Sequence, residues 1–202
     1  MAISPHVVGE PSQHWTVEDY LQIDDDRRYE LLRGTLVETP TPPTVHQHFL
    51  TQFGAEAALH VRENGLGRVF DAPFDVFLAD DTVVQPDLTF ILESRADEIL
   101  DEQGLRGAPD LVVEVLSPST SWRDRHAKRE IYADEGVEWL LFADPESRVV
   151  EVFHRQDESG KYLLETTFDP SDTFRIELFP EFAVELGEMW PPRSEGSEDA
   201  DE

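Results

Sequence analysis

An acidic side chain interrupts a strongly apolar stretch of this chain. The run of residues 111 to 116 places Val112, Val113 and Val115 around Glu114, a pattern typical of a strand buried on both faces. An ionised carboxylate is costly in such a place unless a cation or hydrogen-bond donors pair with it. The chain must therefore fold so that a partner reaches Glu114.

Two aspartates are candidate partners, because the triplet Pro-Asp-Leu occurs twice, around Asp87 and around Asp110. Asp110 and Glu114 belong to one predicted strand and lie about 13 Å apart at ~3.3 Å per residue, which is too far to share a metal ion. Asp87 belongs to another predicted strand, and sheet pairing can bring it beside Glu114 at the spacing that a hard cation needs. An ion pair between Glu114 and an arginine remains an equal alternative to this metal site.

Lysine is rare in this chain, with Lys128 and Lys161 the only two among 16 basic residues. Lys128 falls on the predicted helix that follows the Glu114 strand, at the edge of the face marked by Ile131 and Tyr132. From there its ammonium group can reach toward the end of the strand. An exposed ion pair with Asp124 is the structural alternative, but the rarity of lysine favours a functional role.

The apolar pattern predicts one domain of class α/β (α+β). Helices are expected over residues 44 to 64 and about 122 to 135, and a shorter one is expected to start at Thr16, with Val17, Tyr20 and Leu21 facing inward. A hairpin is expected around Arg33-Gly34, and further strands over 67–78, 82–92, 110–116, "VEWLLFADP", "RVVEVFHR" and "YLLETTF". A strand-helix-strand unit in a mostly antiparallel set predicts a mixed β-sheet flanked by helices. We expect this domain over residues 1 to 190 and a disordered acidic tail over 191 to 202.

The charge balance is extreme, since 44 acidic and 16 basic residues give a formal net charge of −28. Such self-repulsion opposes a compact state in dilute buffer, but at molar salt the Debye length shrinks to about 3 Å and the repulsion is screened. We therefore expect a halophilic, cytoplasmic protein, because no secretory signal or membrane-spanning segment is recognisable. The absence of cysteine excludes disulfides, thiolate metal sites and cysteine nucleophiles.

Several short motifs occur in a characteristic order: "YELLRGTLVE", "TPPTVHQHF", "VVQPDLTFIL", "PDLVVEVLSPST" and "DRHAKREIYADEGVEWLLFADP". From about residue 15 to residue 155, this set resembles the Uma-two family of restriction endonucleases, within the PD-(D/E)XK nuclease superfamily. The resemblance implies a restriction-endonuclease-like core. The lysine expected two residues after the second acid is Leu116 here, and Lys128 corresponds to the migrated lysine typical of the family.

The resemblance also implies roles for the central residues. Asp87 and Glu114 would bind Mg²⁺ or Mn²⁺, with the carbonyl oxygen of Val115 as a further ligand. Lys128 would stabilise charge on the scissile phosphate or orient the attacking water.

Two further candidates and a basic patch surround this set. Glu30 matches the Tyr-Glu-Leu motif, and a solvated strand face is its structural alternative. His46 begins the long helix on its apolar side and is a candidate to line the site, although a lone histidine there is more often a boundary residue. The patch consists of Arg123, Arg125 and Arg129, close to Lys128 in the sequence, and is expected to contact DNA.

The function expected from these residues is metal-dependent hydrolysis of DNA by an endonuclease. The net charge argues against it, since nucleic-acid binding normally shows a basic stripe, and only the local patch offsets this objection. A catalytically inactive binding or assembly module is the alternative, and a two-carboxylate glycosidase ranks last because it would leave Lys128 and the motif order unexplained. A homodimer is expected by analogy, since cutting both strands needs two sites.

The charge balance generates a first prediction. We expect the midpoint of thermal unfolding, followed by circular dichroism, to rise steadily as NaCl increases from about 0.05 M to about 3 M, because salt screens the repulsion between carboxylates. Sucrose at matched osmolality serves as the uncharged control and should raise the midpoint less. A midpoint that does not respond to NaCl would refute the inference from charge.

Overall fold

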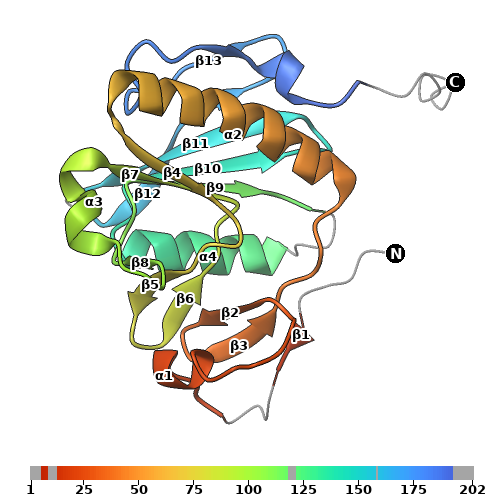
Figure 1. The fold of residues 1–202 in the computed structure, drawn as a ribbon. Helices are drawn as coiled ribbons and strands as arrows, with labels where there is room; N and C mark the ends of the chain where they lie inside the picture. The colour runs from red at the N-terminus through yellow and green to blue at the C-terminus, as the bar shows by residue number, and fades with distance from the viewer. Residues whose placement is uncertain (1–5, 9–12, 118–121, 158, 193–202) are drawn as a thin grey trace, which may run out of the picture.

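The computed structural model describes residues 6–8, 13–117, 122–157 and 159–192, and of residues 122–124 it describes the backbone alone. Most of the predicted acidic tail, residues 193–202, lies outside the described residues. In the described part of the chain, no helix is long and apolar enough to span a bilayer. The strands form two six-stranded sheets and one two-stranded sheet (Figure 1).

The larger sheet has the strand order β12-β11-β10-β9-β7-β4. Its strands are β4 (Gly67–Asp71), β7 (Leu88–Leu92), β9 (Leu111–Val115), β10 (Trp139–Asp144), β11 (Val149–Gln156) and β12 (Lys161–Phe168). Strands β9 and β10 are parallel, joined through helix α4 (Trp122–Asp134), and the other neighbours are antiparallel. The predicted mixed sheet with a strand-helix-strand unit is confirmed.

Helices cover both faces of this sheet, with α2 (Thr44–Asn64) on one side and α4 on the other (Figure 1). The side chains of Phe49, Phe53, Ala57 and Val61 recur every four residues and are buried against the sheet. Gly65, with φ of 61°, ends α2 as predicted. The chain's last described elements, β13 (Thr173–Phe174), β14 (Val184–Glu185) and a 3-10 helix (Leu186–Met189), pack beside α2.

The smaller sheet has the order β1-β3-β2-β6-β5-β8. Its strands are β1 (His6–Val7), β2 (Tyr29–Leu32), β3 (Thr35–Glu38), β5 (Val76–Ala79), β6 (Thr82–Val84) and β8 (Leu105–Arg106). The predicted β2-β3 hairpin is present, and Arg33 and Gly34 both have positive φ, of 50° and 78°, as a type I′ turn requires.

Helix α1 (Val17–Tyr20) packs on this smaller sheet and begins with the predicted capping box between Thr16 and Asp19. Leu21 was expected to face inward, and this was wrong, since its side chain is 44% exposed. The helix ends after one turn, with Leu21 as its C-cap.

Prolines divide both long strands predicted over residues 67–78 and 82–92. The first is interrupted at Pro73 and becomes β4 and β5; the second is interrupted at Pro86 and becomes β6 and β7. Since proline lacks an N–H, it cannot continue the ladder in the middle of a sheet. The predicted hairpin survives as the β5-β6 pair in the smaller sheet, whereas β4 and β7 pair in the larger one. Asp87 therefore lies at the crossing between the two sheets.

Asp110, the second aspartate of the Pro-Asp-Leu pair, links the larger sheet to helix α3 (Glu93–Ile99). Its carboxylate is buried, accepts a hydrogen bond from the Leu92 N–H at 2.8 Å and forms an ion pair with Arg95 at 2.7 Å. Arg95 also donates to the carbonyl oxygen of Ala108 at 2.9 Å. These contacts indicate that the role of Asp110 is structural: it joins β7 and helix α3.

Replacement of Asp110 by alanine should lower the free energy of unfolding by about 2–3 kcal/mol, because the Leu92 N–H and Arg95 lose a buried acceptor. Urea denaturation measures this change. Asp97→Ala, on the helix that carries Arg95, is the control, since Asp97 pairs with Arg68 at an exposed site, and it should change stability by less than about 1 kcal/mol. Equal effects of the two variants would contradict the structural role of Asp110.

Candidate active site

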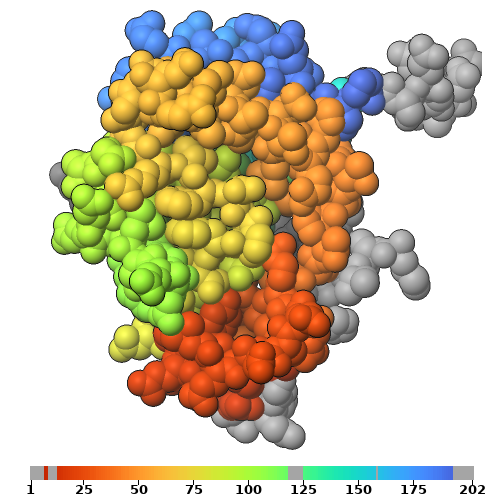
Figure 2. Space-filling view, in the orientation of Figure 1, coloured from red at the N-terminus to blue at the C-terminus, as the bar shows by residue number. Residues whose placement is uncertain are grey.

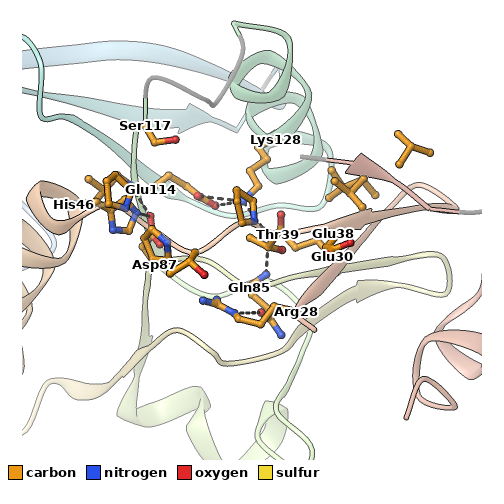
Figure 3. Close-up of a pocket in the computed structure, with 18 residues that line it drawn as sticks. Arg28, Glu30, Glu38, Thr39, His46, Gln85, Asp87, Glu114, Ser117 and Lys128 are labelled. Atoms are coloured by element: carbon orange, nitrogen blue, oxygen red, sulfur yellow. Dashed lines mark hydrogen bonds and ion pairs between the residues drawn. The ribbon is translucent and has the colours of Figure 1, made fainter. Parts of the chain in front are cut away.

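A pocket with a cavity volume of about 180 Å³ opens between the smaller sheet, the beginning of α2 and the end of β9. The sequence-predicted residues that line it are Glu30, His46, Asp87, Glu114, Val115 and Lys128. They come from β2, α2, the β6-β7 connection, β9 and α4, and Figure 3 shows their polar groups gathered at one place. Tertiary folding thus brings together residues that are spread over a hundred positions of the chain.

The pairing of β7 with β9 brings Asp87 next to Glu114. Leu88 pairs with Val113, so one further step along the antiparallel register puts Asp87 opposite Glu114. The Asp87 oxygen Oδ2 accepts a hydrogen bond from the Val115 N–H at 2.7 Å. The carboxylate of Asp87 is therefore held at the end of β9, the strand that carries Glu114.

His46 is the second residue that holds Asp87. Its Nε2 lies 3.0 Å from Oδ2 of Asp87, and since a carboxylate can only accept, Nε2 carries the proton of this hydrogen bond. The imidazole is buried, and among the described residues Nδ1 has no hydrogen-bond partner. His46 thus lines the pocket and positions the Asp87 carboxylate through Nε2.

Lys128 is the partner of Glu114. Its ammonium nitrogen lies 3.0 Å and 3.1 Å from the two carboxylate oxygens of Glu114, and 2.9 Å from Oε1 of Glu30. The hydroxyl of Tyr132, one helical turn further along α4, also donates to Glu114. The Lys128 side chain is only 14% exposed and lies among these acids. The side chain of Asp124, the alternative partner that the sequence left open, lies outside the described residues.

Burial and like charges shift the protonation equilibria of this cluster. Burial raises the pKa of Glu114 from 4.5 to about 7; Lys128 opposes the rise, while the charges of Asp87 and Glu30 add to it. For Lys128, burial disfavours the charged form, but Glu114, Glu30 and Asp87 outweigh burial and raise its pKa. Lys128 is therefore a permanent cation, whereas Glu114 gains or loses a proton near neutral pH.

Arg125 and Arg129 of the predicted basic patch are not among the residues that line the pocket. Arg125 forms an ion pair with Glu151 and lies over the ring of Phe142, with 4.7 Å from its guanidinium carbon to the ring centroid. Arg129 lies over the ring of Phe153 at 5.3 Å. The side chain of Arg123 is outside the described residues. Contact of these arginines with DNA stays a prediction.

The sequence reasoning missed several polar residues of the site, among them Arg28, Gln85 and Tyr132. Gln85 lines the pocket and donates its backbone N–H to Glu30 at 2.9 Å, and Arg28 lines it beside Gln85. Tyr132 was read only as a marker of the apolar face of α4. Its spacing of four residues from Lys128 was the available signal for a shared partner.

Three carboxylates of the pocket are the candidate ligands for a hard divalent cation. Glu30, Asp87 and Glu114 contribute three carboxylates around the ammonium of Lys128, so the cluster carries excess negative charge when these acids are ionised. In the part of the chain that the structure describes, no three His, Asp or Glu side chains form a ready metal cage. Mg²⁺ commonly uses one or two carboxylates and completes its coordination with water and phosphate, so Asp87 and Glu114 meet this need.

Comparison with known proteins identifies the fold and the family of this chain. A solved structure described as a putative nuclease belonging to DUF820 from Anabaena variabilis superposes with a TM-score of 0.71 at 18% sequence identity, covering 87% of this chain and 97% of that chain. At this identity the likeness shows a shared fold. No curated protein matches the sequence. The model of the Uma2 family, described as "Putative restriction endonuclease", matches residues 17–187. The chain therefore belongs to the Uma2 family of restriction-endonuclease-like proteins.

Proposed function

We propose that this protein is a Mg²⁺- or Mn²⁺-dependent endonuclease that hydrolyses DNA phosphodiester bonds in a halophilic cytoplasm. The observation that carries the proposal is the convergence of Asp87, Glu114 and Lys128 on one pocket. The family description and the fold shared with a protein described as a putative nuclease support the reaction class. A homodimer is part of the proposal, because cutting both strands of a duplex needs two sites.

In this proposal, Asp87 and Glu114 hold the metal, with the carbonyl oxygen of Val115 as a further ligand. The bound cation supplies a more acidic water and neutralises charge on the phosphate. His46 and the Val115 N–H keep the Asp87 carboxylate at the pocket. Tyr132 donates to the Glu114 carboxylate from helix α4, one turn beyond Lys128.

Lys128 is the residue proposed to stabilise the negative charge that develops on the scissile phosphate in the transition state. Its ammonium group is held between Glu114 and Glu30, so it is oriented before substrate arrives. Preorganised cations of this kind stabilise a transition state without a reorganisation cost. Glu30 is proposed to position Lys128, which gives a role to the acid of the Tyr-Glu-Leu motif.

Substitution of the three central residues tests this function. Asp87→Asn, Glu114→Gln and Lys128→Ala should each reduce nicking of supercoiled DNA, with Mn²⁺ at high salt, by about 10²–10³-fold or more. Lys161→Ala removes the other lysine, which is exposed, and should leave the rate unchanged. Circular dichroism confirms folding of each variant. Cleavage at the wild-type rate by all three variants would eliminate the proposed site.

The alternative, an inactive binding or assembly module, predicts a different pattern. The strong negative charge of the chain favours it, since acidic proteins bind nucleic acid poorly outside a local basic site. Such a module should show no cleavage and no stabilisation by Mn²⁺ or Mg²⁺, whereas the proposed enzyme should show both.

The pKa of Glu114 generates a pH prediction. Since burial raises this pKa to about 7, Mn²⁺ must displace a proton below that pH, so its affinity should fall up to tenfold per unit below about pH 7 and level off above it. The Mn²⁺-induced rise in melting temperature measures this dependence. Without metal, the folded state binds more protons than the unfolded chain between about pH 4.5 and 7, so this group's contribution to stability decreases as pH rises.

Tyr132→Phe is the sharpest control for the pH prediction. The Tyr132 hydroxyl lowers the pKa of Glu114, so its removal should move the pH midpoint of Mn²⁺ binding upward. Phenylalanine keeps the buried ring of Tyr132 and adds no polar group. An unchanged midpoint in this variant would show that another group governs the pH dependence.

A further inference from the structure

Arg28 lies where two cavities meet. Beside the pocket described above, a second cavity of about 350 Å³ lies along α2, lined by Gln47, Thr51 and Gly54 of the helix and by Val69 and Asp71 of β4. Arg28, Pro42 and Asp87 line both cavities. Figure 2 shows the face on which the residues of α2 and β4 adjoin those of the first hairpin. A DNA strand that extended from the first pocket into the second cavity would therefore pass Arg28.

Within the described ranges of the chain, the guanidinium of Arg28 forms no ion pair with a carboxylate. Among the described residues, six other arginines form ion pairs with carboxylates, namely Arg27, Arg33, Arg68, Arg95, Arg106 and Arg125, but no carboxylate lies within ion-pair distance of Arg28. Its partner is the neutral Gln85, whose Oε1 accepts from Nε at 3.3 Å. In so acidic a chain, a half-buried arginine without an acidic partner is a cation free to bind another anion.

Gln85 is itself fixed in a way that orients Arg28. Its amide nitrogen donates to Oδ1 of Asp75 at 2.8 Å and to the hydroxyl of Tyr20 at 3.4 Å. Since a carboxylate only accepts, the amide nitrogen must face Asp75, and the amide oxygen must face Arg28. Figure 3 shows Arg28 and Gln85 side by side near Asp87. The hydrogen bond uses Nε and leaves the two terminal nitrogens of the guanidinium for a ligand.

We propose that Arg28 binds a backbone phosphate next to the scissile one and so sets the path of the strand into the second cavity. The inference rests on the proposed function and deepens it. The two terminal nitrogens form the planar fork that binds two phosphate oxygens at once. The carboxylates of Asp71 and Asp87 repel phosphate elsewhere along this path, which restricts anion binding to Arg28.

The test compares Arg28→Gln with Arg27→Gln, the adjacent arginine that is exposed and paired with Asp25. Binding of labelled single-stranded and duplex DNA is followed by fluorescence anisotropy over a range of NaCl, with Ca²⁺ replacing Mg²⁺. Arg28→Gln should weaken binding about tenfold and reduce the slope of log K against log salt by about 0.7–0.9, the value of one phosphate contact. Arg27→Gln should match the wild type.

Cleavage kinetics separate binding from a merely structural role. Arg28→Gln should raise KM with little change in kcat, since a remote phosphate is bound equally in the ground and transition states. Arg28→Lys should recover part of the affinity and most of the salt slope, because it restores one charge. Loss of thermal stability in Arg28→Gln with an unchanged salt slope would overturn the inference.

The outcomes also distinguish this inference from the proposed function. If the wild type neither binds nor cuts DNA, the proposed function fails and the role of Arg28 fails with it. If the wild type binds and cuts DNA while Arg28→Gln keeps the same affinity and salt slope, the inference about Arg28 alone is wrong.

Discussion

The burial of Glu114 in β9 is the constraint on which the site depends. A carboxylate between two helix-covered faces needs donors, and α4 provides two of them on successive turns, the ammonium of Lys128 and the hydroxyl of Tyr132. Lys128 also contacts Glu30 of the first hairpin, so one ion cluster joins the larger sheet, the helix on its face and the smaller sheet. Removing Lys128 would leave the carboxylates of Glu30 and Glu114 without their shared cation, which explains why these segments must dock together.

The prolines determine where the second acid lies. Pro73 and Pro86 interrupt what would otherwise be one long hairpin. The chain passes from the larger sheet to the smaller one at Pro73 and returns to the larger sheet at Pro86. Asp87 follows Pro86 directly, so its carboxylate lies at the crossing rather than inside a ladder. There it accepts from the Val115 N–H and from His46, which belong to different elements. A position of this kind is both held in place and open to a cavity.

The few basic side chains of this chain have specific partners in the structure. Arg33, Arg68 and Arg106 pair with acids at the surface, which limits self-repulsion in a chain with a net charge of −28. Lys128 is confined to the acid cluster, and Arg28 is held by Gln85 beside it. Recognition of a polyanion by such a protein therefore depends on the local geometry of the pocket and not on an overall basic field. High salt in solution would weaken long-range steering but leave buried contacts largely unscreened.

Local patterns in the sequence determined the elements of this protein. Helical periodicity predicted α2 to the residue at both ends, Arg33-Gly34 predicted a hairpin, and the lone acid in an apolar run identified Glu114 as a residue that needs a partner. Asp87 and Lys128 could be predicted as its neighbours because sheet pairing and helix spacing are regular. The tertiary structure alone decided that the hairpin divides between two sheets, that His46 and Tyr132 hold the acids, and that Arg28 faces the pocket without an acidic partner. These facts depend on distances between segments far apart in the chain, which no local periodicity encodes.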